Sequence, residues 1–125
     1  MSPAPEAARR ILEKVLNKQL YVIITTAVAP REEIEKLLPE HLEHQIRLEN
    51  EGVMFGAGPL FTEQDKGGRG MIIVRAGSFA EAHAIADRDP FHKRGLRTYT
   101  VERWHLNEGT VSVRINYSDG SYKLD

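Results

Sequence analysis

The hydrophobic positions between residues 20 and 106 change repeatedly between the spacing of a strand and that of a helix. Leu20–Val28 carries no charge and is rich in β-branched residues, which is typical of a buried strand. After Pro30 the apolar positions recur every three or four residues, as on one face of a helix. The pattern predicts strands at residues 20–28, 53–60, 71–76 and 97–106, and helices from Pro30 to Gly52 and from Ser78 to Asp87.

Residues at the ends of these two helices support the assignment. Glu32 and Glu33 place carboxylates in the first turn, where the helix dipole favours negative charge. Pro39 interrupts the first helix, so we expect a kink or a restart there. Ser78 is a typical N-cap residue, and Glu81 three positions later completes a capping-box pattern.

Two further segments flank this core. Residues 5–17 are predicted to form a helix with one apolar stripe, and residues 107–125 a β-hairpin with a turn at Ser118-Asp119-Gly120. We therefore interpret residues 1–125 as a single domain with a core of residues 20–106. Residues 1–19 are its N-terminal helical extension, and residues 107–125 are its C-terminal β extension.

The order strand, helix, strand, strand, helix, strand predicts an α+β fold of the ferredoxin-like βαββαβ type. In this fold both helices pack on one face of a four-stranded sheet, and the other face stays bare. A second copy of the chain is the simplest cover for that face. We therefore expect a homodimer or a higher homo-oligomer.

Composition excludes several classes of protein. The chain has 125 residues with 17 Lys and Arg against 18 Asp and Glu, so it lacks the broad basic surface of a nucleic-acid-binding protein. It contains no cysteine, which excludes disulfides, zinc–thiolate sites and a cysteine nucleophile. The longest apolar run is far short of the roughly 20 residues that span a membrane. The chain begins without a hydrophobic signal core, so we expect a soluble, cytoplasmic protein.

Histidine is the side chain best suited to carry protons near neutral pH. Of the five histidines, His41 falls among the apolar positions of its predicted helix and should point towards the sheet, with His44 nearer the edge. If the helix restarts at Pro39, the dipole favours a neutral imidazole at His41. Two interpretations stay open, a hydrogen-bonded structural histidine and a general base.

Asp89 is the second candidate, and it also allows two interpretations. It directly precedes Pro90, which makes it a good N-cap for a short helix. Both helices of a ferredoxin-like subunit pack on the same face of the sheet. The loop after the second helix can therefore bring Asp89 close to His41, although the fold does not require it.

Other chemistry has weaker support in the sequence. His41 and His44, with His92 or Asp89, have a spacing that permits a metal site, but the HExxH pattern is absent. The glycines around Gly68 are not followed by the Lys-Ser/Thr pair of a phosphate-binding loop. Four arginines could bind a carboxylate: Arg69, Arg75, Arg94 and Arg97. Tyr99 and Trp104 could line a pocket or fill the core.

Three segments together resemble the YciI-like, or YCII-related, proteins. They read HLEHQIRLENEGVMFGAGPL, MIIVRAGSFAEAHAIADRDPFHKRGL and TYTVERW, and the resemblance spans residues 20–106. It implies a subunit that forms a dimeric α+β barrel, related to muconolactone isomerases and small cofactor-free monooxygenases. It also implies a His–Asp dyad, which corresponds to His41 and Asp89 here. Members of one class remove chloride from a chlorinated hydroxyquinol. The two extensions lie outside the usual family chain.

These observations predict a small-molecule enzyme that transfers protons without a cofactor or metal, as a lyase (dehydrochlorinase) or an isomerase. His41 would be the general base or acid, and Asp89 would orient it. The expected substrate contacts are Phe55, Gly58, Pro59, Phe91 and Trp104. The alternatives are a non-catalytic dimeric ligand-binding or accessory domain, and a haem- or metal-dependent relative. An open cavity with His41 in its wall favours an enzyme, whereas a filled interior favours an accessory domain.

Overall fold

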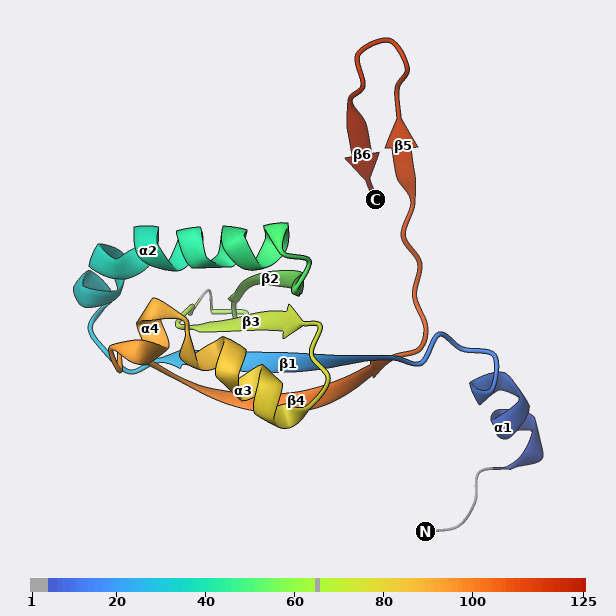
Figure 1. Ribbon diagram of the computed structural model, residues 1–125, viewed down its shortest axis with the longest axis horizontal. Coiled ribbons are helices and arrows are strands. Elements are labelled where there is room, and N and C mark those ends of the chain that lie inside the picture. Colours follow the sequence, from blue (N-terminus) through green and yellow to red (C-terminus); the bar gives the residue numbers. More distant parts are fainter. Residues whose placement is uncertain (1–4, 65) are drawn as a thin grey trace. The chain divides into compact units, whose positions relative to one another are not determined.

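The computed structural model describes residues 5–64 and 66–125, which form two compact units. One unit is Gln19–His105, and the other consists of residues 1–18 and 106–125. The first contains a four-stranded sheet in the order β2-β3-β1-β4, in which β3 is antiparallel to both β1 and β2 (Figure 1). The strands are β1 (Lys18–Ala27), β2 (Met54–Leu60), β3 (Arg69–Val74) and β4 (Arg97–Leu106). The helices are α2 (Arg31–Asn50), α3 (Phe79–Asp87) and the short α4 (Pro90–Lys93).

This topology confirms the ferredoxin-like α+β fold expected from the order of the elements. The core lies between one face of the sheet and the helices α2 and α3, which cover that face together (Figure 1). Its members alternate along the strands and recur at helical spacing on α3, as burial of one face requires. They are Tyr21, Ile23, Ile72 and Val74 from the sheet, Leu48 from α2, and Ala82, Ile85 and Ala86 from α3.

None of the helices described for this unit covers the opposite face of the sheet. Tyr99 and Val101 pack against the core, so alternation along β4 directs Trp104 to the other face. There Trp104 contacts Phe55 of β2 edge to face, with ring centroids 6.2 Å apart. Phe55 remains 40% exposed. This helix-free face therefore presents apolar side chains.

Helix α2 differs from expectation in two ways. It runs without interruption through Pro39, so the predicted restart does not occur. His41 therefore lies in the middle of a 20-residue helix, and the argument from a helix N-terminus does not apply to it. The prediction that His44 lies near the edge was also wrong: it is 7% exposed and buried with Leu37 and Leu48.

At the other helix ends, the predictions for Ser78 and Gly52 are confirmed, and that for Glu81 is confirmed only in part. The Ser78 hydroxyl accepts a hydrogen bond from the backbone N–H of Glu81 at 3.1 Å, as an N-cap does. The Glu81 carboxylate accepts from the N–H of Gly77 rather than that of Ser78, so the capping box is shifted by one residue. After α2, Gly52 takes a positive φ of 75°, which glycine adopts without strain.

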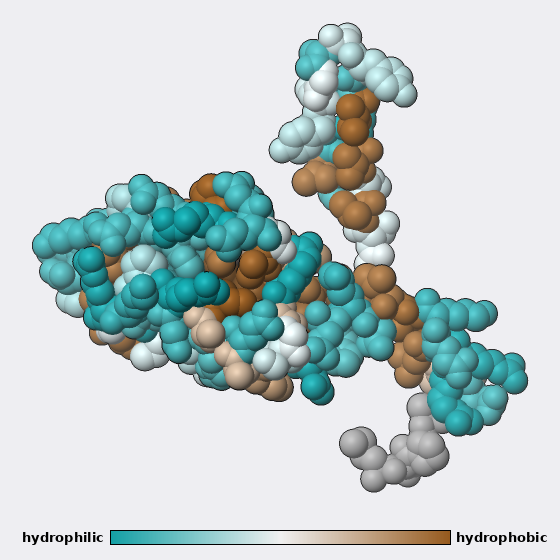
Figure 2. All heavy atoms as spheres, in the orientation of Figure 1, coloured by the Kyte–Doolittle hydropathy of each residue, from teal (hydrophilic) through white to brown (hydrophobic). Residues whose placement is uncertain are grey.

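The second unit carries the two extensions. Helix α1 spans Glu6–Leu12 and is shorter than the predicted 5–17. None of its residues is buried, and so short a helix has little support from packing. The predicted hairpin is present as β5 (Val113–Ile115) and β6 (Tyr122–Leu124), and its apolar side chains are exposed (Figure 2).

None of the helices in the described part of the chain is long and apolar enough to cross a membrane.

Two leucines of α2 test this picture of the core. Leu48 is 4% exposed, whereas Leu42 is 51% exposed. Leu48→Ala should lower the free energy of unfolding by about 2–5 kcal/mol, because it leaves a cavity in the core. Leu42→Ala should lower it by less than about 1 kcal/mol. Urea denaturation followed by circular dichroism measures both, and equal losses would contradict the proposed placement of the core.

Candidate active site

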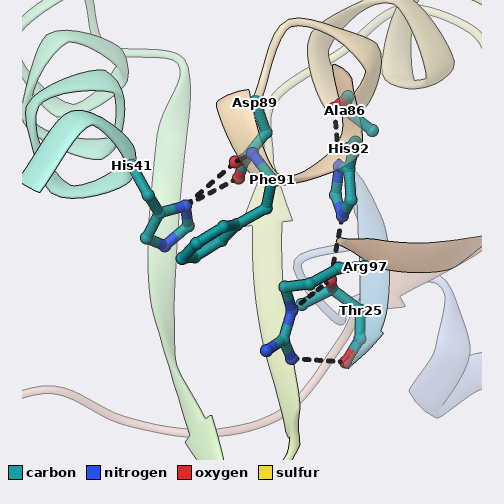
Figure 3. Close-up of polar contacts among 7 residues, drawn as sticks. All are labelled: Thr25, His41, Ala86, Asp89, Phe91, His92 and Arg97. Atoms are coloured by element: carbon teal, nitrogen blue, oxygen red, sulfur yellow. Dashed lines mark hydrogen bonds and ion pairs between the residues drawn. The ribbon is translucent and has the colours of Figure 1, made fainter. Parts of the chain in front are cut away.

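His41 and Asp89, the two candidates from the sequence, are hydrogen-bonded to each other. The Nδ1 atom of His41 lies 3.0 Å from Oδ1 and 2.9 Å from Oδ2 of Asp89 (Figure 3). His41 projects from the middle of α2, and Asp89 stands immediately before α4. The side chain of His41 is 15% exposed, whereas Asp89 is 3% exposed. The pair therefore joins a partly accessible imidazole to a buried carboxylate.

Asp89 has both of the roles that its sequence context allows. Its Oδ1 atom accepts a hydrogen bond from the backbone N–H of Phe91 at 2.9 Å, which makes it the N-cap of α4. The same carboxylate accepts the hydrogen bond from His41. The cap fixes the carboxylate in position, and the fixed carboxylate then orients the imidazole.

The electrostatics of the pair keep Asp89 ionised. Burial raises the pKa of Asp89, but the hydrogen bond and charge of His41 and the N–H of Phe91 outweigh it, so its pKa lies below the ordinary value for an aspartate. An ionised carboxylate only accepts hydrogen bonds, so the Nδ1 atom of His41 carries a proton. In the neutral imidazole, Nε2 is then the unprotonated nitrogen that can accept a proton.

Neighbouring His44 has a different character. Burial lowers its pKa, and the negative charge of Asp89 only partly opposes that effect. The neutral form of His44 is therefore favoured, and its ring belongs to the interior of the protein. Although His44 is only three residues from His41, just one of these two histidines is accessible at the site.

A cavity of about 1000 Å³ opens beside His41. The Phe91 ring stacks on the imidazole at a centroid distance of 4.4 Å and an interplanar angle of 26°. Of the predicted substrate contacts, Gly58, Pro59 and Phe91 line the cavity with His41. Exposed side chains of α2 contribute an apolar wall, consisting of Leu38, Leu42 and Ile46.

Phe55 and Trp104, the other two predicted substrate contacts, do not line this cavity. They lie on the helix-free face of the sheet, because alternation along a strand sends neighbouring side chains to opposite faces. Tyr99 packs against the core instead. Its hydroxyl donates to Asp87 at 2.6 Å, and burial together with this carboxylate raises the pKa of Tyr99 to about 12.

A second polar network, which the sequence did not predict, borders the cavity. Arg97 donates from Nε to the Thr25 hydroxyl at 2.9 Å, and that hydroxyl lies 2.8 Å from Nε2 of His92 (Figure 3). In the sequence pattern Arg97 was one of four arginines that could bind a carboxylate, with no priority over the other three. The sequence feature that could have distinguished Arg97 is its position as the first residue of the strand that follows the DPFHKRGL turn.

Gln45, one turn after His41 on α2, was also missed. It lines the cavity, and its buried Oε1 atom has no hydrogen-bond partner among the residues described. Among all the residues that the structure describes, no group of three His, Asp or Glu side chains could hold a metal ion. His92 bonds to Thr25 and Ala86 and does not join His41 and His44 as a metal ligand.

The fold and the site together define a ferredoxin-like protein with a His–Asp pair at the wall of an open cavity. The model of the YCII-related domain family matches residues 19–105, so this chain belongs to that family. No curated protein matches the chain.

Among solved structures, the chain is similar to the 5-chloro-2-hydroxyhydroquinone dehydrochlorinase TftG of Burkholderia phenoliruptrix AC1100. The two are 25% identical, with a TM-score of 0.51, over 68% of this chain and 92% of the other. That structure is a complex with 2,5-dihydroxybenzoquinone.

The lowered pKa of Asp89 predicts how the pair contributes to stability as the pH changes. Asp89→Asn keeps an oxygen for the cap but loses the charge, so the variant should be less stable than the wild type at neutral pH. The advantage of the wild type should be complete above about pH 4, the pKa in an unfolded chain, and should disappear as the pH falls through the lower pKa of the folded state.

Urea denaturation at a series of pH values measures this difference. Glu35→Gln is a matched control, because the Glu35 side chain is 60% exposed and pairs only with Arg31. It should change the free energy of unfolding by less than about 0.5 kcal/mol throughout. If the difference in free energy of unfolding between wild type and Asp89→Asn stays constant down to pH 2, ionisation of Asp89 does not stabilise the fold.

Proposed function

We propose that this chain is a cofactor-free small-molecule enzyme that moves protons on hydroxylated aromatic or related ring compounds. The observation that carries this proposal is the geometry of His41. Its Nδ1 atom is held by a buried carboxylate at 2.9 Å, while its ring lines an open cavity. This arrangement orients one nitrogen and leaves Nε2 available for a substrate.

Asp89 supports proton transfer in two ways. Because it accepts from Nδ1–H, it fixes the tautomer in which Nε2 is basic. When Nε2 takes a proton, the negative charge of Asp89 stabilises the imidazolium. The stacked ring of Phe91 restrains the imidazole further. His41 is thus the catalytic base and acid, and Asp89 is its positioning residue.

A base of this kind serves two linked steps on a polyhydroxylated ring. His41 takes the proton of a ring hydroxyl and returns it to a ring carbon, which converts that hydroxyl to a ketone. This step alone is an isomerisation. Where the same carbon carries chlorine, chloride then leaves as a second hydroxyl loses its proton, and the product is a quinone. The net loss is HCl, so the reaction needs no oxidant or reductant.

The similarity to the dehydrochlorinase supports elimination as the reaction type, and its ligand suggests a ring that carries several oxygens. The apolar wall of the cavity and its polar groups suit such a ring. An accessory domain without chemistry would be favoured by a filled interior, whereas the cavity here is open at His41.

We further propose that a second copy of the chain covers the helix-free face of the sheet. Apolar side chains on that face include Phe55, which is 40% exposed, and Trp104. A two-fold axis through such a face places the same apolar patch of both subunits in contact, so the two patches cover each other. The apolar side chains on this face, which do not contact the core, would then be buried.

Replacement of His41 tests the catalytic role. With 5-chloro-2-hydroxyhydroquinone as substrate, His41→Ala should lower the rate of chloride release by about 10²–10⁴-fold. His41→Gln, whose amide can still donate to Asp89, should be equally impaired while keeping the wild-type circular dichroism spectrum. The matched control is His83→Ala, since His83 is exposed and contacts Tyr99 instead of the cavity.

A second readout does not depend on a leaving group. Wild-type protein should catalyse exchange of ring hydrogens of 1,2,4-trihydroxybenzene in D₂O under anaerobic conditions, and His41→Gln should not. Proton exchange and chloride release that both persist in His41→Gln would rule out His41 as the proton carrier.

Sedimentation equilibrium at micromolar concentration tests the dimer. Wild-type protein should sediment as a dimer or a larger oligomer, and Ile24→Lys should shift it towards the monomer by placing a charge on the helix-free face. Ile115→Lys, in the exposed hairpin, is the matched control and should leave the mass unchanged. A wild-type monomer, or a shift caused by Ile115→Lys alone, would contradict this interface.

A further inference from the structure

Arg97 is a charged group at the cavity that takes no part in the proton transfer proposed for His41. Arg97 donates from Nε to the Thr25 hydroxyl at 2.9 Å, and from Nη2 to the carbonyl oxygens of Thr25 at 3.1 Å and Gly68 at 3.0 Å. These bonds use two of the three guanidinium nitrogens. Within residues 5–64 and 66–125, no residue accepts a hydrogen bond from Nη1.

The guanidinium is held in a fixed orientation. His92 donates from Nδ1 to the carbonyl oxygen of Ala86 at 2.7 Å, so in the neutral ring its Nε2 accepts. The Thr25 hydroxyl, 2.8 Å away, therefore donates to Nε2 and accepts from Arg97. Thr25 is itself only 5% exposed. This chain of hydrogen bonds leaves the guanidinium little freedom to turn.

No carboxylate of the described residues forms an ion pair with Arg97, although the negative charge of Asp89 acts on it over a longer distance. In the described part of the chain, no Asp or Glu oxygen lies within 4.0 Å of its nitrogens, whereas Arg31 pairs with Glu35 and Arg94 with Glu40. A half-buried, fixed and unpaired guanidinium is an unusual arrangement for a structural arginine, because an exposed or paired charge costs less. It leaves one strong donor for an anion.

Arg97 and His41 share the cavity. Both line it, and both lie against Phe91: the imidazole stacks on its ring, and the guanidinium carbon lies 5.8 Å from the ring centroid. Figure 3 shows Phe91 between them, with the free nitrogen of Arg97 directed away from Thr25. A small ring held at the edge of Phe91 can therefore face a proton acceptor and a fixed cation at two of its own positions.

We infer that Nη1 of Arg97 is a binding subsite for an anionic oxygen of the substrate, and that the substrate class is therefore an ionised hydroxylated ring or enolate with two separated oxygens. This inference rests on the proposed function and specifies its substrate. One oxygen binds at Arg97 as an oxyanion while His41 transfers the proton of another. Arg97 thus selects for charge and stabilises the negative charge that delocalises across the ring as the proton leaves.

A purely structural role makes a different prediction. If Arg97 only fastens β1 to the segment that contains Gly68, its loss weakens the fold and reduces the binding of every ligand alike. If Nη1 binds an anion, its loss weakens anionic ligands selectively. Comparison of a charged ligand with an uncharged one built on the same ring separates the two roles.

The experiment uses two probes and the full chain. 2,5-Dihydroxybenzoquinone is an anion at neutral pH, because its hydroxyls are vinylogous acids, and 2,5-dimethoxybenzoquinone carries the same ring without charge. Isothermal titration calorimetry should show that wild-type protein binds the charged probe at least about tenfold more tightly, as expected for a charge-assisted hydrogen bond. Equal affinities for the two probes in the wild type would overturn the inference, whatever the variants do.

Two substitutions and a control then locate the anion. Arg97→Gln should abolish the preference for the charged probe and leave the affinity for the uncharged probe unchanged. Arg97→Lys should keep part of the preference for the charged probe. Arg69→Gln, which removes an exposed arginine of the same cavity, should keep the full preference. A preference that is lost in Arg69→Gln, or an equal loss for both probes in Arg97→Gln, would contradict the assignment.

His41→Gln distinguishes this inference from the proposed function. It should bind the charged probe with wild-type preference while it no longer transfers protons. Should His41→Gln instead remain active, the proposed catalytic role fails, although the anion subsite stands on the titrations. Should the preference persist in Arg97→Gln, the subsite fails and the role of His41 is unaffected.

Discussion

A carboxylate that is only 3% exposed has to be satisfied inside the protein, and Asp89 is satisfied from two directions. The backbone N–H of Phe91 binds one oxygen from the start of α4, and His41 binds both from α2. Burial of the charge raises the pKa of Asp89, but the hydrogen bond and charge of His41, the N–H of Phe91 and the charge of His92 together bring it below the ordinary value. The buried charge therefore ties two helices together and fixes which nitrogen of His41 carries a proton.

The arrangement of the cavity follows from this constraint. Because Asp89 starts α4, the next apolar residue, Phe91, is placed against the imidazole that the same carboxylate holds. The turn after α4 then leads into β4, whose first residue is Arg97. A short stretch of chain thus supplies the buried carboxylate, the stacking ring and the guanidinium, while α2 contributes the imidazole and the apolar wall of the cavity. Sites held by such local geometry need little reorganisation when a substrate binds.

Much of the fold was predictable because its signals are local. The bounds of β4 agree with the alternation along its sequence, and Ser78 caps α3 as its type suggests. Pro39 predicts a kink or a restart, and the restart does not occur. Helix α2 continues through it, because a proline ends a helix only when the surrounding structure does not compensate for the lost hydrogen bond. The N-terminal helix was overestimated, since an apolar stripe favours a helix only where something packs against it.

The sequence by itself determined the order of the elements and the cap at Asp89, because hydrophobic period and capping depend on neighbours within a few positions. The pairing of His41 with Asp89 was implied by the resemblance to the YCII-related proteins and left open by the local pattern. Only the tertiary structure decided which groups meet across the fold. It buried His44 and left His41 at the cavity, placed Phe55 and Trp104 on the opposite face, and singled out Arg97 among the arginines. Those outcomes depend on how α2 and the strands cross in space, which a one-dimensional pattern does not encode.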